Sequence, residues 1–272
     1  MSVEYKDWKR HSEEILGRLR SSGLASKPGA VFLSGKSSLA PGKLCIMGFN
    51  PGGDPDRGLP IEQQFADFDL SEDFNCFSSY ENECWYPTCE NRVHQHFLDG
   101  ERQCPRSPCR KGNRRDQVMI KKVVCVLAPM LGIRGDIKSV FSTNAIFATS
   151  KTVDTLKNCT DLWEKCWPIH QYLLAIVRPE AILCLGYQDG KSAFSFLKAK
   201  SNATASDGAA RPGPGNRSYA LIRYFRARLP IEKLEPLACT VIGIPHHARY
   251  STFVSTNLGA MKDELAKILG GN

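Results

Sequence analysis

The sequence has no apolar run approaching the roughly 20 residues that a membrane-spanning helix needs. Its amino terminus, MSVEYKDWKRHSEEIL, is charged and lacks the apolar segment of a signal peptide. No internal repeat is visible, which argues against a repeat architecture. We therefore expect a cytoplasmic protein that has no membrane partner.

The sequence also lacks the known phosphate-binding loops. "SGKSS" (34–38) and "GYQDGKS" (186–192) contain Gly-Lys-Ser, but no upstream glycine has the spacing of a P-loop. "GFNPGG" (48–53) does not match the Gly-x-Gly-x-x-Gly of dinucleotide-binding folds. Nucleotide binding of these two kinds is not expected.

The chain contains eleven cysteines, an odd number. In a cytosolic protein we expect them to be free thiols or metal ligands rather than a disulfide framework. Cys45, Cys125 and Cys184 lie in apolar runs and are predicted to be core residues. Four others have the spacing C-x4-C-x14-C-x4-C: Cys84, Cys89, Cys104 and Cys109. They are candidate ligands of a structural zinc or an iron–sulfur cluster, with His94 and His96 as substitutes. The alternative is that they are free thiols.

Charge is unevenly distributed in this chain of net charge +8. Residues 51–90 contain ten acidic side chains and one basic one, whereas 101–122 contain eight basic side chains and 211–233 contain six. Segregated positive charge is typical of proteins that bind a polyanion, and nucleic acid is the expected partner. The alternative is a pair of solvated basic surfaces.

Apolar runs and helical periodicity alternate along the chain. Buried strands are predicted at 44–49, 138–149, 181–186 and 238–245, and helices at 4–21, 116–131, 161–178, 191–199 and 258–269. Helix 161–178 is predicted to kink or restart at Pro168, and 200–218 to be a flexible loop. The pattern indicates an α/β protein, a three-layer α/β/α sandwich around a mostly parallel four-stranded sheet. We expect one domain, 1–272, with an N-terminal helical extension (1–40) and a cysteine-rich insertion (60–115).

Polar residues follow or interrupt three of these strands. They are found at Asn50–Gly53, at Thr143–Asn144 and at His246–Ser251. In parallel sheets, ligands bind outside the carboxyl ends of the strands. These three places are therefore the candidate site.

The same three places, in this order, resemble motifs of the uracil-DNA glycosylase superfamily. "GFNPGG" (48–53) is similar to its first motif, "STNAI" (142–146) to the strand whose asparagine reads the flipped base, and "HHARYS" (246–251) to its His-Pro-Ser-x-x-Ser motif. "VRPEAILCLG" (177–186) resembles the third strand. The resemblance extends over about residues 42–258 in outline and is sharp only in these short segments.

The resemblance implies a monofunctional DNA glycosylase that flips a pyrimidine from the DNA and hydrolyses its glycosidic bond. Asn50 would hold the water, His246 would donate to the base carbonyl, and Asn144 would bond the base edge. Further base contacts are expected from Gly48, Phe49 and a stacking aromatic, Phe65, with Phe68, Phe74 and Phe77 as alternatives. DNA contacts are expected from Pro51, Gly52, Gly53, His247, Arg249, Tyr250 and Ser251. Catalysis needs no cofactor in this reading, and we expect a monomer.

The sequence departs from the family pattern at His247, where the family has proline, and at Ala248, where it has serine. The first motif contains no lysine, so lyase chemistry through a Schiff base is not expected. Uracil or a 5-substituted uracil is the default substrate. Some superfamily members defend bacteria by excising glucosylated cytosines from phage DNA, and this substrate stays open.

Other interpretations remain at this point. Three of them give the candidate residues a purely structural role. Asn50 would cap a turn, Asn144 would bond a backbone group at a strand kink, and His246 would be a partly buried structural histidine. A nucleic-acid-binding module of the same fold with a degenerate pocket is the alternative function. A glycosidase for free nucleosides is a third, which the basic stretches disfavour.

Overall fold

The structure is a computed structural model, and it describes residues 5–52, 55–56, 58–70, 114–133, 140–212, 218–246, 253–254 and 256–270. Within these ranges no helix is both long enough and apolar enough to cross a bilayer.

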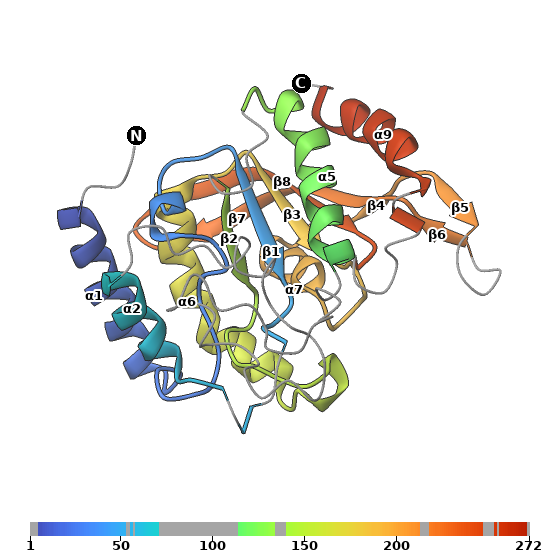
Figure 1. The fold of residues 1–272 in the computed structure, drawn as a ribbon. Helices are drawn as coiled ribbons and strands as arrows, with labels where there is room; N and C mark the ends of the chain where they lie inside the picture. Colours follow the sequence, from blue (N-terminus) through green and yellow to red (C-terminus); the bar gives the residue numbers. More distant parts are fainter. Residues whose placement is uncertain are drawn as a thin grey trace, which may run out of the picture.

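A six-stranded sheet in the order β2-β1-β3-β8-β7-β4 lies at the centre of the molecule (Figure 1). Its strands are β1 (Leu44–Gly48), β2 (Phe141–Asn144), β3 (Ala181–Leu185), β4 (Ser206–Asp207), β7 (Arg223–Ile231) and β8 (Leu234–Ile244). The neighbours from β2 to β8 pair in parallel, whereas β7 pairs antiparallel with β8 and with β4. The prediction of an α/β protein with a mostly parallel sheet is confirmed. The predicted count of four strands is wrong.

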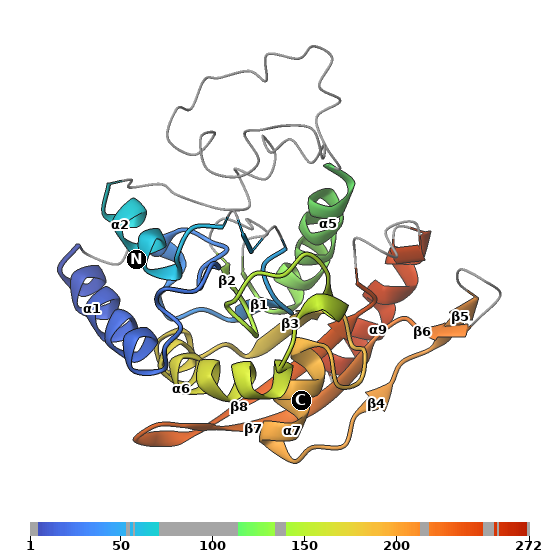
Figure 2. The same ribbon diagram turned by 90° about the horizontal axis from the view of Figure 1, so that it is seen from below.

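The two unexpected strands extend the sheet beyond β8. In β7, buried Phe225, Ala227 and Leu229 alternate with exposed Arg226 and Arg228. The strand is therefore apolar on one face only, and it is not a continuous apolar run like the parallel strands. β4 and the separate β5–β6 hairpin (Ala210–Pro212 and Ser218–Ala220) fall in or next to the segment predicted as a loop. Figure 2 shows this hairpin on the opposite side of the molecule from α1.

Helices pack on both faces of the sheet. They are α1 (Tyr5–Ser21), α2 (Ile61–Leu70), α5 (Arg114–Met130), α6 (Cys159–Val177), α7 (Ala193–Ser201) and α9 (Leu258–Gly270), with 3-10 turns η1 (Lys36–Ser38) and η3 (Val153–Thr155). In Figure 1, α1, α2 and α6 group to one side of the strands, and α5 and α9 lie together on the other. One apolar cluster joins the strands to α1, α2, α6 and α7, and a second joins them to α5 and α9.

Alternation along the parallel strands divides their side chains between the two clusters. Cys45 and Met47 of β1 belong to the first cluster, and Leu44 and Ile46 to the second. β3 divides in the same way. Because both faces are covered by helices, all five residues of β1 are buried, as the continuous apolar run predicts.

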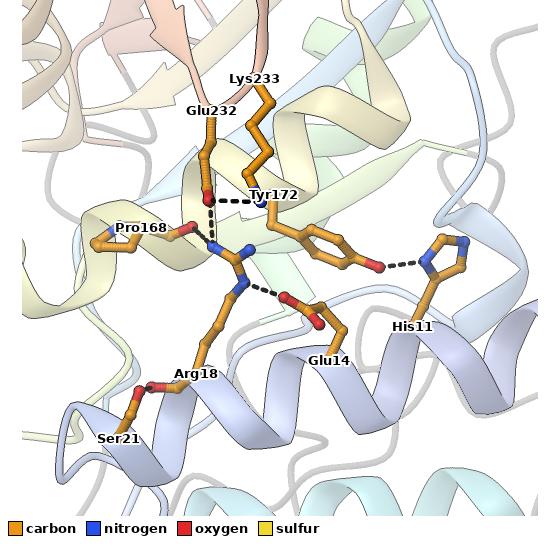
Figure 3. Close-up of polar contacts among 8 residues, drawn as sticks. All are labelled: His11, Glu14, Arg18, Ser21, Pro168, Tyr172, Glu232 and Lys233. Carbon is orange, nitrogen blue, oxygen red and sulfur yellow. Dashed lines mark hydrogen bonds and ion pairs between the residues drawn. The ribbon is translucent and has the colours of Figure 1, made fainter.

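The amino-terminal helix is part of the same core and is also held by polar contacts (Figure 3). Nη1 of Arg18 donates to a carboxylate oxygen of Glu232 at 2.7 Å and to the carbonyl of Pro168 at 3.1 Å. The guanidinium also lies 5.1 Å from the ring centre of Tyr172, whose hydroxyl is 2.7 Å from Nδ1 of His11. α1 is thereby tied to α6 and to the β7–β8 turn.

Most predicted helices are confirmed, with two corrections. α6 is one helix that runs through Pro168, so of the two predicted alternatives the restart is wrong and the kink stays a prediction. Cys125 is exposed, whereas Cys45 and Cys184 are buried as predicted. The reason is helical spacing, because Val123, Val124 and Leu127 of α5 face the core and Cys125 faces away. Burial raises the pKa of the Cys45 and Cys184 thiols, so both are core groups rather than nucleophiles.

Replacing Gly243 with alanine is expected to destabilise the protein by about 1–3 kcal/mol, because the new methyl group overpacks the core. A Cβ at this position of β8 would lie 2.7 Å from Cβ of Tyr187 and 2.8 Å from Cδ2 of Phe194. Gly17→Ala is the matched control. Gly17 lies within helix α1, and a Cβ there would have no atom within 4 Å beyond its own stretch of helix, so we expect the alanine to stabilise the helix. Urea unfolding measures both, and equal effects from the two variants would contradict the packing described.

Candidate functional site

Parallel pairing brings the carboxyl ends of four strands to one edge of the sheet. Gly48 of β1 pairs with Asn144 of β2, and Leu185 of β3 pairs with Ile244 of β8. Asn50, Asn144 and His246 therefore all lie at the edge where these strands end. This is the arrangement that the sequence predicts for a ligand site in a parallel sheet.

Asn50 is half-buried and is held through its side-chain nitrogen. Nδ2 donates to Oγ of Ser150 at 2.9 Å, to the carbonyl of Pro51 at 3.0 Å and to the carbonyl of Ala148 at 3.4 Å. Among the residues that the structure describes, none donates to Oδ1. The side chain thus presents an unused acceptor, which is the group required to hold a water.

The surroundings of Asn50 determine which way its amide faces. Turning the amide over would bring Oδ1 against the carbonyl oxygens of Pro51 and Ala148, and neither carbonyl can donate. The nitrogen must therefore face the protein. Capping of a local turn, through the carbonyl of Pro51, is only one of the three contacts.

Asn144 is buried at 3% exposure, and its Nδ2 has no hydrogen-bond partner among the described residues. A buried donor without a partner costs about 1–3 kcal/mol, which makes it a candidate for a group whose partner is a ligand. The interpretation of Asn144 as a residue that satisfies a strand kink finds no support in these contacts.

Gly48 makes the position of Asn144 possible. A Cβ at Gly48 would overlap Oδ1 of Asn144 and would lie 3.4 Å from its Cγ. Only glycine leaves room for the amide to lie against the main chain of β1. The sequence predicted that Gly48 and Asn144 would contact the same base, and the close approach of the Asn144 amide to Gly48 is consistent with that prediction.

His246 follows β8 and is exposed rather than partly buried. It lies next to the end of β3, where a Cβ on Gly186 would be 3.7 Å from Cδ2 of His246. Gly186 has a φ of +108°, a backbone conformation open to glycine and strained for other residues. Gly186 therefore turns the chain away from β3 beside this histidine.

Behind β2, on the α6 side, His170 supports the segment that follows Asn144. It is fully buried, and its Nε2 donates to the carbonyl of Ala145 at 2.9 Å, since a carbonyl can only accept. Burial lowers the pKa of His170 to about 4, while its bonds to the carbonyls of Ala145 and Asn144 oppose the shift. The ring is neutral at pH 7 and lies 5.4 Å from that of Trp163.

The two aromatic residues predicted to contact a base, Phe65 and Phe49, both pack in the core of the protein. Phe65 is 1% exposed and stacks on Trp8, with ring centres 6.2 Å apart, in the first apolar cluster. Phe49 is 6% exposed and stacks on Phe196 at 5.9 Å in the same cluster. Stacking of Phe65 on a base and a base contact by Phe49 both stay predictions. Pro51 and the exposed Gly52 lie beside the site, because the backbone of each contacts the backbone of Ser150.

Several predicted residues lie outside the described part of the chain. They are Gly53, Phe74, Phe77, Cys84, Cys89, Cys104, Cys109, His247, Arg249, Tyr250 and Ser251, and also the side chain of Phe68. The metal-binding prediction for the four cysteines thus concerns residues outside the described ranges. In the ranges that are described, no group of three or more potential ligands could hold a metal ion.

Three residues of the site were missed by sequence reasoning. Ser150 contacts Asn50, Gly186 turns the chain beside His246, and His170 binds the carbonyl after Asn144. Gly186 ends the run LCLG at a strand end, which was a usable signal. Ser150 and His170 carry no local signal, because their contacts exist only in the folded chain.

No protein-family model matches the chain, and no curated protein matches it.

Asn50→Asp is expected to destabilise the protein more than Asn50→Ala, by about 1–3 kcal/mol, because a carboxylate cannot donate and would face two carbonyl oxygens. Alanine removes the same donor without adding a charge. Urea unfolding at pH 7 measures both variants. Equal stability of the aspartate variant and the natural protein would contradict the described orientation of the amide.

Stability is expected to fall as the pH drops from about 6.5 to about 4, in part because of His170. The unfolded chain binds a proton at this side chain below its ordinary pKa of 6.5, whereas the folded chain resists it down to about 4. The slope from one such group approaches about 1.4 kcal/mol per pH unit. Unfolding measured between these pH values should be less steeply pH-dependent in His170→Leu and His170→Gln. An unchanged slope in both variants would contradict a neutral, buried His170.

Proposed function

We propose that the protein is a monofunctional DNA glycosylase, with a uracil-DNA glycosylase-like three-layer α/β/α sandwich. The observation that carries the proposal is the edge of the sheet where β1, β2 and β8 end. It combines the oxygen of Asn50 and the buried nitrogen of Asn144, neither of which has a hydrogen-bond partner among the described residues, with exposed His246. Each is the type of group that its proposed role requires.

Hydrolysis needs a water held beside the sugar. In the proposal, Oδ1 of Asn50 accepts a hydrogen bond from that water, whose oxygen bonds to C1′ as the bond from C1′ to the base nitrogen breaks. The electron pair leaves with the base, and the proton that the water loses passes to the departing base, so that the products are an abasic sugar and the neutral base. An amide is a weak base, so the rate depends on how well the water is positioned and on how well the departing base is stabilised.

The departing base is read and stabilised by the other two groups. Asn144 combines a donor and an acceptor in one planar amide and can bond a pyrimidine edge twice, which discriminates by about 1–3 kcal/mol. His246 bonds the base carbonyl as negative charge develops there. Loss of one such donor costs about 2.7–4 kcal/mol of transition-state stabilisation.

The proposed partner is DNA. A net charge of +8, with basic side chains gathered in 101–122 and 211–233, favours a polyanion over a small neutral substrate. Uracil or a 5-substituted uracil is the proposed base, and a glucosylated hydroxymethylcytosine of phage DNA is the second candidate. We propose a cytoplasmic monomer that needs no cofactor for catalysis.

The competing proposal is a nucleic-acid-binding module whose pocket has lost its activity. Its support is the departure of His247 and Ala248 from the family pattern. A binding module needs neither Asn50 nor His246 for affinity. A glycosylase needs both for turnover, and this difference separates the two proposals.

Base release from labelled oligonucleotides is the test. The panel contains uracil, thymine mismatches, 5-hydroxymethylcytosine and its glucosylated form, each in single and double strands. We expect release from at least one of them, and a fall of at least about 100-fold in single-turnover rate for Asn50→Ala, because the attacking water is no longer placed. DNA affinity, measured by fluorescence anisotropy, is expected to stay within a few-fold.

Ser21→Ala is the control variant, because Ser21 ends α1 and its hydroxyl donates to the carbonyl of Arg18 in the same helix. Intact DNA binding without release of any base would overturn the proposal in favour of the binding module. Release that Asn50→Ala leaves unchanged would show that other residues perform the reaction.

A further inference from the structure

The side chain that faces the nitrogen of Asn50 belongs to a segment far along the chain. Oγ of Ser150 accepts from Nδ2 of Asn50 at 2.9 Å. The same hydroxyl donates to the carbonyl of Thr152 at 2.8 Å. Because its one proton is used by Thr152, the hydroxyl can only accept from Asn50, which fixes the direction of both bonds.

Ser150 is itself firmly placed. It is 5% exposed, its backbone nitrogen donates to the carbonyl of Pro51 at 3.2 Å, and it forms a parallel bridge with Gly52. The first motif and the segment after β2 are thus joined by backbone and side-chain contacts at the same point.

The acceptor that orients Ser150 is also held in place. The carbonyl of Thr152 accepts from Oγ1 of Thr155 at 2.8 Å and from its backbone nitrogen at 3.1 Å. Thr152 and Thr155 form a reciprocal cap on η3. The amide of Asn50 is therefore connected, through one hydroxyl, to a closed turn.

We propose that Ser150 is a positioning residue for Asn50: it holds Nδ2 so that Oδ1 points to the place of the attacking water. The role of the water rests on the function proposed above. The position of the amide does not, because it follows from the contacts of Asn50 alone. Ser150 touches neither base nor sugar in this proposal.

The first measurement is single-turnover base release by Ser150→Ala, on the substrate that the natural protein cleaves. We expect the rate to fall about tenfold, with KM and DNA affinity unchanged, because the amide loses one of its three anchors. Ser150→Thr retains the hydroxyl and is expected to recover most of the rate.

Two controls separate positioning from folding. Ser21→Ala removes a serine hydroxyl that also donates to a backbone carbonyl, that of Arg18 in α1, without reaching Asn50, and it is expected to keep its rate. In the Asn50→Ala background, adding Ser150→Ala should lower the residual rate no further, since the group that Ser150 positions is gone. An equal tenfold loss in that background, or the same loss in Ser21→Ala, would overturn the proposal.

A second measurement does not depend on activity. The side-chain amide signals of Asn50 in a ¹⁵N-labelled protein, assigned by their loss in Asn50→Ala, should shift and exchange faster with water in Ser150→Ala. Unchanged signals would overturn the positioning role even if the protein is a glycosylase. Changed signals in a protein that releases no base would leave the positioning intact and overturn only the function.

Discussion

Parallel pairing of β1 with its two neighbours is the constraint on which the candidate site depends. The pairing of Gly48 with Asn144 aligns the ends of β1 and β2, and the pairing of β3 with β8 aligns the other two ends. Without that alignment, three polar residues distributed over the whole chain would share no surface. The close approach at Gly48 adds a second requirement, because any side chain there would overlap the amide of Asn144.

The two asparagines differ in how they are held, and this difference matches their proposed roles. Asn50 uses its nitrogen for three protein contacts, and no described residue donates to its oxygen, which suits a group that holds water. Asn144 is buried, and its nitrogen has no partner in the described part of the chain, which suits a group that binds a base. The free energy lost by burying that donor is offset by the burial of apolar side chains in the two clusters that cover both faces of the sheet.

The parallel core could be predicted from sequence because strands covered on both faces are continuous apolar runs, as in β1 and β3. β7 was missed because its exposed arginines break that pattern, and β4 because it lies in a polar, glycine-containing segment. Asn50, Asn144 and His246 could be selected as candidates because each follows or interrupts a predicted strand. Ser150 and His170 could not, since their significance arises from contacts between segments that only the fold brings together.

The most direct test of the central claim is mass spectrometry of the oligonucleotide panel after incubation with the protein in ¹⁸O-labelled water. Hydrolysis at C1′ predicts an intact strand that has lost one base and gained a single ¹⁸O on the sugar. Unchanged masses for every oligonucleotide that the protein binds would contradict the account, and so would a cleaved strand without the label.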